Sequence, residues 1–316
     1  MKTYSIILLA FLLVASCTIE EREPLKGGML SQLNKLPHDA SLVGYINFKT
    51  IRQSSLYDLF QQNAERELFS SPEYEEFVTK TGFDLQKDMH EFYFAAVPQK
   101  EDKPINGIFI ARGDYDPEKL IDYIQKNAEE KDLTISEYRS VSLYQIEDGN
   151  MVFCFKDSNT IIGGKEELVK HILDEQKQDT QLGLLPQIKK LKYKNWAWMA
   201  MQAEPFIAKI KDRPYADRMQ GLQSIMDAGF ALKLSEKLIV DGYCTCTDAD
   251  KAKLLMEAAK GAIAAAKLSM SNDRDAIDIL NKIAVETDDN IITTNAEMER
   301  AEIEKMLAKR QSMLSI

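Results

Sequence analysis

The sequence has few of the side chains that usually carry enzyme chemistry. Its 316 residues include three histidines and four cysteines, and the histidines do not stand at metal-ligand spacing. The motifs His-Glu-x-x-His, Gly-x-Ser-x-Gly and Cys-x-x-Cys do not occur in it. We therefore expect no metal, no cofactor and no catalytic residues, and the favoured interpretation is that the protein is not an enzyme.

Positive charge is also scarce. Forty basic residues against 50 acidic ones give a net charge of −10. A surface of this sign repels the phosphate backbone, which excludes a protein that binds nucleic acid by phosphate neutralisation. The balance of 45% hydrophobic and 28% charged residues excludes a disordered or fibrous chain, and the length allows one large domain or two modest ones.

No hydrophobic run is long enough to cross a bilayer, which takes about 20 residues. The clearest one, 6–14, follows Lys2 and has the length of the hydrophobic region of a secretory signal. It ends in Val14-Ala15-Ser16-Cys17. The remainder of the chain is expected to be water-soluble.

These four residues resemble the lipobox of bacterial lipoproteins. The resemblance implies a signal peptide over residues 1–16, cleavage between Ser16 and Cys17, lipid on the Cys17 thiol and an acyl group such as palmitate on the new amine. Several chains anchor a protein stably, because each buried CH₂ contributes about 0.8 kcal/mol. The alternatives are an ordinary signal peptide with a chance cysteine, or a short helix of the fold.

The residues after Cys17 bear on location. Thr18 stands where an aspartate marks inner-membrane retention in Gram-negative lipoproteins, so the resemblance favours the outer membrane with the body facing the periplasm. Glu20-Glu21 are also compatible with acidic export tags, which keeps the cell surface as an alternative. The expected partners are the membrane, through the lipid, and either an unknown envelope protein or an apolar ligand.

The remainder alternates strand-like and helix-like segments. Residues 17–35 are expected to be the acylated cysteine and a tether with a little helix near 29–33, because Pro24 and Gly27-Gly28 interrupt any hydrophobic period. The rest predicts an α+β fold of two units, 36–185 and 186–316, each a mainly antiparallel sheet with helices packed on it. The expected strands are 42–48, 92–97, 105–111, 133–138, 141–147, 151–156, 160–163, 196–202, 228–234, 238–246, 283–286 and 290–294. The expected helices are 51–64, 73–80, 116–128, 165–175, 203–223 with a break near Pro214, 248–269 and 296–310.

The two halves end alike. Residues 157–162 lead into a helix that contains Leu168 and Ile172, and residues 288–292 lead into one that contains Ile303 and Leu307. Upstream, each half has a hairpin that feeds a capped helix. A duplication would explain this order; the alternative is chance similarity within any α+β chain.

Three short segments carry a further resemblance. They are Leu36-Pro37-His38-Asp39-Ala40 before a strand, Thr81-Gly82-Phe83-Asp84 after a helix, and Gly163-Gly164 before a helix. They are similar to a group of bacterial envelope proteins of unknown function that open with Leu-Pro-x-Asp-Ala. The resemblance implies a fold class over residues 36–310 and transfers no catalytic residue.

Gly163-Gly164-Lys165 does not form a phosphate-binding loop. That motif needs a glycine where this chain has Asn159 and a serine or threonine where it has Glu166. The two glycines are therefore assigned to a tight turn before a helix.

Cys244 and Cys246 are expected on one face of a strand, with Asp241, Tyr243 and Thr245 on the other. Buried thiols are the favoured interpretation. A redox or metal pair, or a disulfide to Cys154 in an oxidising envelope, remains an alternative.

Trp196 and Trp198 also share one face of a strand, with Met199 and Met201 on the other. The two indoles belong either to the core or to a stacking platform for a sugar or a partner's apolar anchor. They are the only aromatic binding residues that the sequence proposes. The alanine-rich helix at 248–269 likewise indicates either tight packing or a partner-binding surface or cavity wall.

The favoured function is a lipid-anchored envelope protein with a non-enzymatic binding or assembly role. The first alternative is a carrier of lipid or another apolar ligand, which predicts a continuous apolar hollow of several hundred Å³. The second is a hydrolase with an unrecognised site, which predicts clustered carboxylates or histidines with shifted pKa values.

Overall fold

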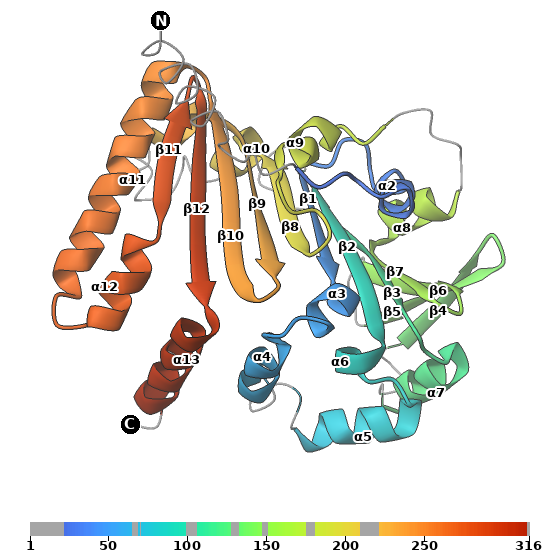
Figure 1. Ribbon diagram of the computed structural model, residues 1–316. Helices are drawn as coiled ribbons and strands as arrows, with labels where there is room; N and C mark the ends of the chain where they lie inside the picture. Colours follow the sequence, from blue (N-terminus) through green and yellow to red (C-terminus); the bar gives the residue numbers. More distant parts are fainter. Residues whose placement is uncertain are drawn as a thin grey trace, which may run out of the picture.

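The computed structural model describes residues 22–64, 69, 71–98, 106–127, 133–146, 151–174, 181–208 and 221–314. Twelve strands in this part form one antiparallel sheet in the order β11-β12-β10-β9-β8-β1-β2-β3-β7-β6-β5-β4. Helices pack against both faces of the sheet, so the α+β prediction is confirmed (Figure 1).

The strands are β1 Leu42–Asn47, β2 Met89–Val97, β3 Asn106–Gly113, β4 Leu133–Tyr138, β5 Val141–Ile146, β6 Met151–Asp157, β7 Thr160–Lys165, β8 Ala197–Gln202, β9 Ile225–Leu234, β10 Lys237–Cys246, β11 Ala284–Asp288 and β12 Ile291–Glu299. The helices are α2 Gly27–Leu33, α3 Phe48–Arg52, α4 Tyr57–Ala64, α5 Pro72–Thr81, α6 Leu85–Asp88, α7 Pro117–Asn127, α8 Glu166–Leu173, α9 Leu185–Lys190, α10 Glu204–Ala208, α11 Ala249–Ser269, α12 Arg274–Asn281 and α13 Arg300–Leu314.

The two predicted units share this sheet, whereas the sequence suggested a sheet for each. Strands β1 and β8 pair with each other at the centre and join the halves. In each half three consecutive strands lie side by side, a helix follows, and the last strand of the half returns to pair with the third. Thus β7 pairs with β3 as β12 pairs with β10.

One turn contact also recurs. The Asn159 side chain donates to the Gly113 carbonyl at the end of β3 (3.0 Å), and the Gly113 N–H donates back to the Asn159 carbonyl (3.1 Å). Asn290 and Cys246 exchange the same two bonds at the end of β10 (2.9 and 2.8 Å). A duplicated unit would leave such a pair of turns, although the duplication itself stays a prediction.

One face of the sheet carries the main core. Val43, Tyr45, Tyr93 and Trp198 project from it with their neighbours at alternate strand positions, and all four are buried. Helices α2, α8 and α9 cover them, and these helices gather on one side in Figure 1. Burial of this face is what makes the centre of the sheet stable.

The opposite face is apolar as well. Phe94 in β2 lies over Gly44 in β1, and Phe109 in β3 lies over Gly163 in β7, because a Cβ on either glycine would come within 2.1–2.3 Å of the ring. Phe92 stacks on Phe109 with ring centroids 5.5 Å apart. Glycine thus lets these rings lie flat along the sheet.

Several expectations need correction. Residues 22–35 do not belong to a free tether: Met29 and Leu33 of α2 are buried in the main core, and Glu23 is bound to the segment before β8. The final helix begins at Arg300 rather than 296, since Ala296 to Glu299 still pair with β10.

The helix expected at 51–64 is two helices, α3 and α4. The Ser54 hydroxyl accepts a hydrogen bond from the Leu56 N–H (3.0 Å) and donates to the Ser235 carbonyl (3.0 Å). A serine that bonds to nearby backbone offers the chain an alternative to the helix. The break turns α4 away from α3.

Candidate functional site

The residues that would carry a lipid anchor, Ser16 and Cys17, lie outside the described residues. Of the helices that are described, none has the length and hydrophobicity needed to cross a membrane. Within the same ranges, no group of three histidine, cysteine or acidic side chains is arranged to hold a metal ion.

The tryptophan pair belongs to the core. Trp198 is 2% exposed, and its indole N–H donates to the Lys194 carbonyl (3.1 Å). Trp196 precedes β8, is half-buried and packs against two hydrophobic clusters. The pair therefore does not present the open stacking platform that one interpretation of the sequence proposed.

The three described cysteines are free thiols. Cys154 lies in β6 and Cys244 in β10, seven strands apart in the sheet. At about 4.8 Å per strand this is several times the distance a disulfide spans, so neither Cys244 nor Cys246 pairs with Cys154. Burial raises the pKa of Cys154 to about 11 and that of Cys244 to about 12, so both thiols are protonated at neutral pH and are poor nucleophiles.

The polar face expected opposite the cysteines is buried. Asp241, Tyr243 and Thr245 are all covered by α9 and the segment that follows it. Lys190 donates to both carboxylate oxygens of Asp227 (2.8 and 3.0 Å) and to the Thr245 hydroxyl oxygen (2.9 Å), which neutralises the acid. This cluster holds α9 on the sheet and leaves no free acid–base pair.

The most distinctive cavity lies on the other face of the sheet, at the end of β1. Here β1 turns directly into α3, and the Asn47 side chain caps this helix by accepting from the Thr50 N–H (2.9 Å). Helix α6 is capped in the same way by Asp84, which accepts from the Gln86 N–H (2.9 Å). These caps fix the two short helices beside β2, while the break at Ser54 sets α4 across from them.

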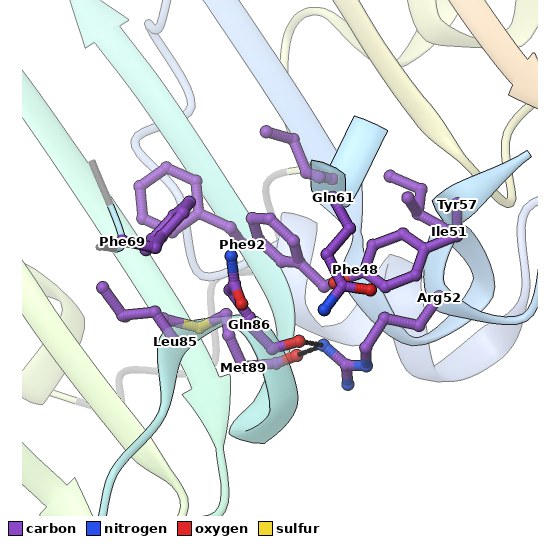
Figure 2. A pocket seen from close by; sticks show the side chains of 11 residues that line it. Phe48, Ile51, Arg52, Tyr57, Gln61, Phe69, Leu85, Gln86, Met89 and Phe92 are labelled. Atoms are coloured by element: carbon purple, nitrogen blue, oxygen red, sulfur yellow. Dashed lines mark hydrogen bonds between the residues drawn. The ribbon is translucent and has the colours of Figure 1, made fainter. Parts of the chain in front are cut away.

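The space between these elements is a hollow of about 450 Å³ with an almost entirely apolar wall. It falls in the size range of small-molecule sites. Figure 2 shows aromatic and aliphatic side chains from α3, from α6 and from β2 directed into it. It is lined by Ile46, Phe48, Ile51, Arg52, Tyr57, Gln61, Phe69, Leu85, Gln86, Met89 and Phe92.

Arg52 joins the two sides of this hollow. One of its terminal nitrogens, Nη1, donates to the main-chain carbonyls of Gln86 (3.1 Å) and Met89 (2.6 Å), as the dashed lines in Figure 2 show. These bonds tie the end of α3 to the turn between α6 and β2. The guanidinium is thereby held at the margin of the hollow, with its alkyl chain along the wall.

A second, more polar hollow of about 570 Å³ lies in the other half of the chain. Its wall includes Gln187, Gln202, Glu204 and Asp227. Part of each wall comes from the segment after the first strand of that half: the segment that joins β1 to β2 for the apolar hollow, and the one that joins β8 to β9 for the polar hollow. One half therefore holds an apolar hollow and the other a more polar one.

Nothing in the sequence singled out the apolar hollow. Its wall comes from segments separated along the chain, and the continuous helix expected at 51–64 concealed the gap between α3 and α4. The usable signal was Ser54-Ser55 near the start of that helix, because serine favours turns and caps over helix interiors.

Comparison with known proteins adds little. No protein-family model matches the chain, and no curated protein matches it. The solved structure of crystal form IV of TP0453 is similar with a TM-score of 0.46 and 8% identity, covering 87% of this chain and 94% of that one. Crystal form I of TP0453 gives 0.43 and 8%, covering 88% and 96%. No functional statement follows from likeness at this level.

Proposed function

We propose that this protein is a lipid-anchored bacterial envelope protein that binds one apolar chain of a lipid or similar ligand in the hollow beside β1 and β2. The observation that carries the proposal is the hollow itself: about 450 Å³ in volume and lined by carbon-rich side chains. Among the functions that the sequence left open, only the carrier of an apolar ligand predicts such a space.

The energetics favour an alkyl chain as occupant. Each methylene moved from water into an apolar wall contributes about 0.8 kcal/mol. Phe48 and Ile51 offer this wall from α3, which the Asn47 cap holds in place, and Phe92 offers it from the paired strand β2. A wall already in place spares the ligand the cost of opening one.

The location rests on the N-terminal segment. The basic start, the short apolar run and Val14-Ala15-Ser16-Cys17 support a lipid anchor, and Thr18 supports the outer membrane with the body in the periplasm. The excess of acidic residues supports the same view, because an acidic body is not attracted to an anionic membrane and needs a lipid to stay there.

Native mass spectrometry tests the binding proposal. The chain from Thr18 onward retains every described residue, and it is to be purified without detergent. We expect a reproducible extra mass of lipid size on the wild type. Met89→Trp, which fills the hollow, should remove it; Met151→Trp, at an exposed methionine of β6, should retain it.

Two results would contradict the proposal. One is a bare mass for the wild type, even after incubation with a long-chain lipid. The other is equal loss of the extra mass in both tryptophan variants. Either would return the non-enzymatic assembly role, with an unknown envelope protein as partner, to first place.

A further inference from the structure

We propose that the ligand carries an anionic head group on its apolar chain, and that Arg52 binds this head at the margin of the hollow. The inference rests on the proposed function and names the class of ligand: a single-chain amphiphile that ends in a carboxylate or a phosphate. It follows from the charge, the fixed position and the ion-pair partners of one side chain.

Arg52 is the only formally charged residue among those described as lining the hollow. It is the last residue of α3, just before the turn at Ser54 that separates α3 from α4, and it is half-buried. A partly desolvated charge is costly unless a counter-ion compensates it. Such an arginine beside an apolar wall therefore favours an anion next to it.

The described part of the chain does not supply that anion. No carboxylate there lies within ion-pair distance of Arg52, whose hydrogen bonds run to two carbonyls through Nη1. Acids on neighbouring elements are engaged elsewhere: Asp58 with Arg300, Glu91 with Arg112, and Asp88 with the Asp84 N–H. The counter-ion is thus expected from the ligand.

The geometry suits a carboxylate or phosphate. Because Nη1 is held by the Gln86 and Met89 carbonyls, the guanidinium plane is fixed before any ligand arrives. A guanidinium has five N–H donors, and its remaining edge can meet two anionic oxygens at once. The chain of the ligand would then follow the Arg52 alkyl segment into the hollow.

Photolabelling of the full chain in membranes from expressing cells tests this inference. Four photoreactive probes of equal chain length are compared: a fatty acid, an alkyl phosphate, a fatty alcohol and an alkylamine. Labelling is read by mass spectrometry on peptides that contain Phe48 or Phe92. We expect the acid, the phosphate or both to label the wild type about tenfold better than the alcohol, the value of one charge-assisted hydrogen bond.

Variants separate charge from structure. Arg52→Gln should lower labelling by the anionic probes about tenfold and leave the alcohol unchanged. Lys49→Gln removes the same charge from an exposed position on the same helix and should change neither. Arg52→Lys keeps the charge and should retain part of the preference for anionic probes over the alcohol. This result would show that the loss in Arg52→Gln comes from the missing charge and not from a distorted hollow.

The outcomes distinguish the two proposals. If no probe labels these peptides, the proposed function fails. If the alcohol and the amine label as well as the anions, or if Arg52→Gln weakens all probes equally, the hollow binds apolar chains and the anionic head is refuted. A preference for the acid over the phosphate, or the reverse, identifies the source of the charge.

Discussion

Lys194 is a lysine within the core. It is 2% exposed, and its ammonium group donates to the Leu191 carbonyl. Desolvation lowers its pKa to about 8, from an ordinary value of 10.5. Nearby Glu23 raises the pKa and only partly offsets the burial. The folded state therefore holds a charge at pH 7 that the unfolded chain accommodates more easily.

The lowered pKa of Lys194 makes the stability of the folded state depend on pH. Between about pH 8 and 10.5 the unfolded chain binds more protons at this site, so the Lys194 contribution to stability rises with pH. We expect Lys194→Met to be more stable than the wild type at pH 7, by up to roughly 3 kcal/mol, with the difference shrinking towards pH 10. Urea unfolding at several pH values measures it. A difference that stays constant with pH would contradict the assignment.

At the scale of elements, the flat rings on the second face of the sheet depend on glycines in the neighbouring strands. A Cβ at position 44 would lie 2.1 Å from the Phe94 ring. We expect Gly44→Ala to lower the free energy of unfolding by about 1–3 kcal/mol through overpacking. Gly107→Ala in β3, where a Cβ meets nothing within 4 Å, is the matched control.

A double variant makes this prediction specific. Combining Gly44→Ala with Phe94→Leu should cost less than the sum of the two single changes, because the shorter side chain relieves the clash. The free energies of unfolding of all four proteins are measured with denaturant. If the two single changes add strictly in the double variant, the packing of the Phe94 ring does not depend on Gly44.

Most elements were predictable because local signals agree with the fold. Asp116 and Asp248 cap α7 and α11 as expected, accepting from the N–H groups of Glu118 and Lys251, and Gly82 ends α5 with a positive φ of 70°. Helix α12 was missed, and α9 is only six residues long. Such short helices depend on tertiary packing, which propensity does not report.

The apolar hollow and the pairing of β1 with β8 were out of reach for a different reason. Both bring together segments far apart along the chain; Asn47, for example, donates from its backbone to the Trp196 carbonyl. A period of two places a residue on one of two sheet faces, but it does not say which strand lies beside it. Site geometry of this kind needs the fold.

At the scale of the whole molecule, the proposed lipid anchor would decide where the body works. We expect Cys17→Ala to give a protein that leaves the membrane fraction or remains as an uncleaved precursor, since the proposed lipid would attach to this thiol. Fractionation combined with intact-mass measurement checks it. A variant that is still processed and still sediments with membranes would contradict the lipobox assignment.

The contacts of Glu23 limit how far the folded body can lie from Cys17. Its backbone N–H donates to the Lys192 carbonyl (2.9 Å), and its carboxylate accepts from the N–H groups of Lys194 (2.7 Å) and Asn195 (2.9 Å), so the chain is fastened to the body from this point. Only five residues lie between it and Cys17, and the six Cα–Cα steps span at most about 21 Å. A lipid on Cys17, as proposed, would keep the body within a few nanometres of the bilayer, so the protein could not carry a ligand from one membrane to another. Any exchange of ligand would take place with the membrane that holds it, or with a partner that comes to that surface.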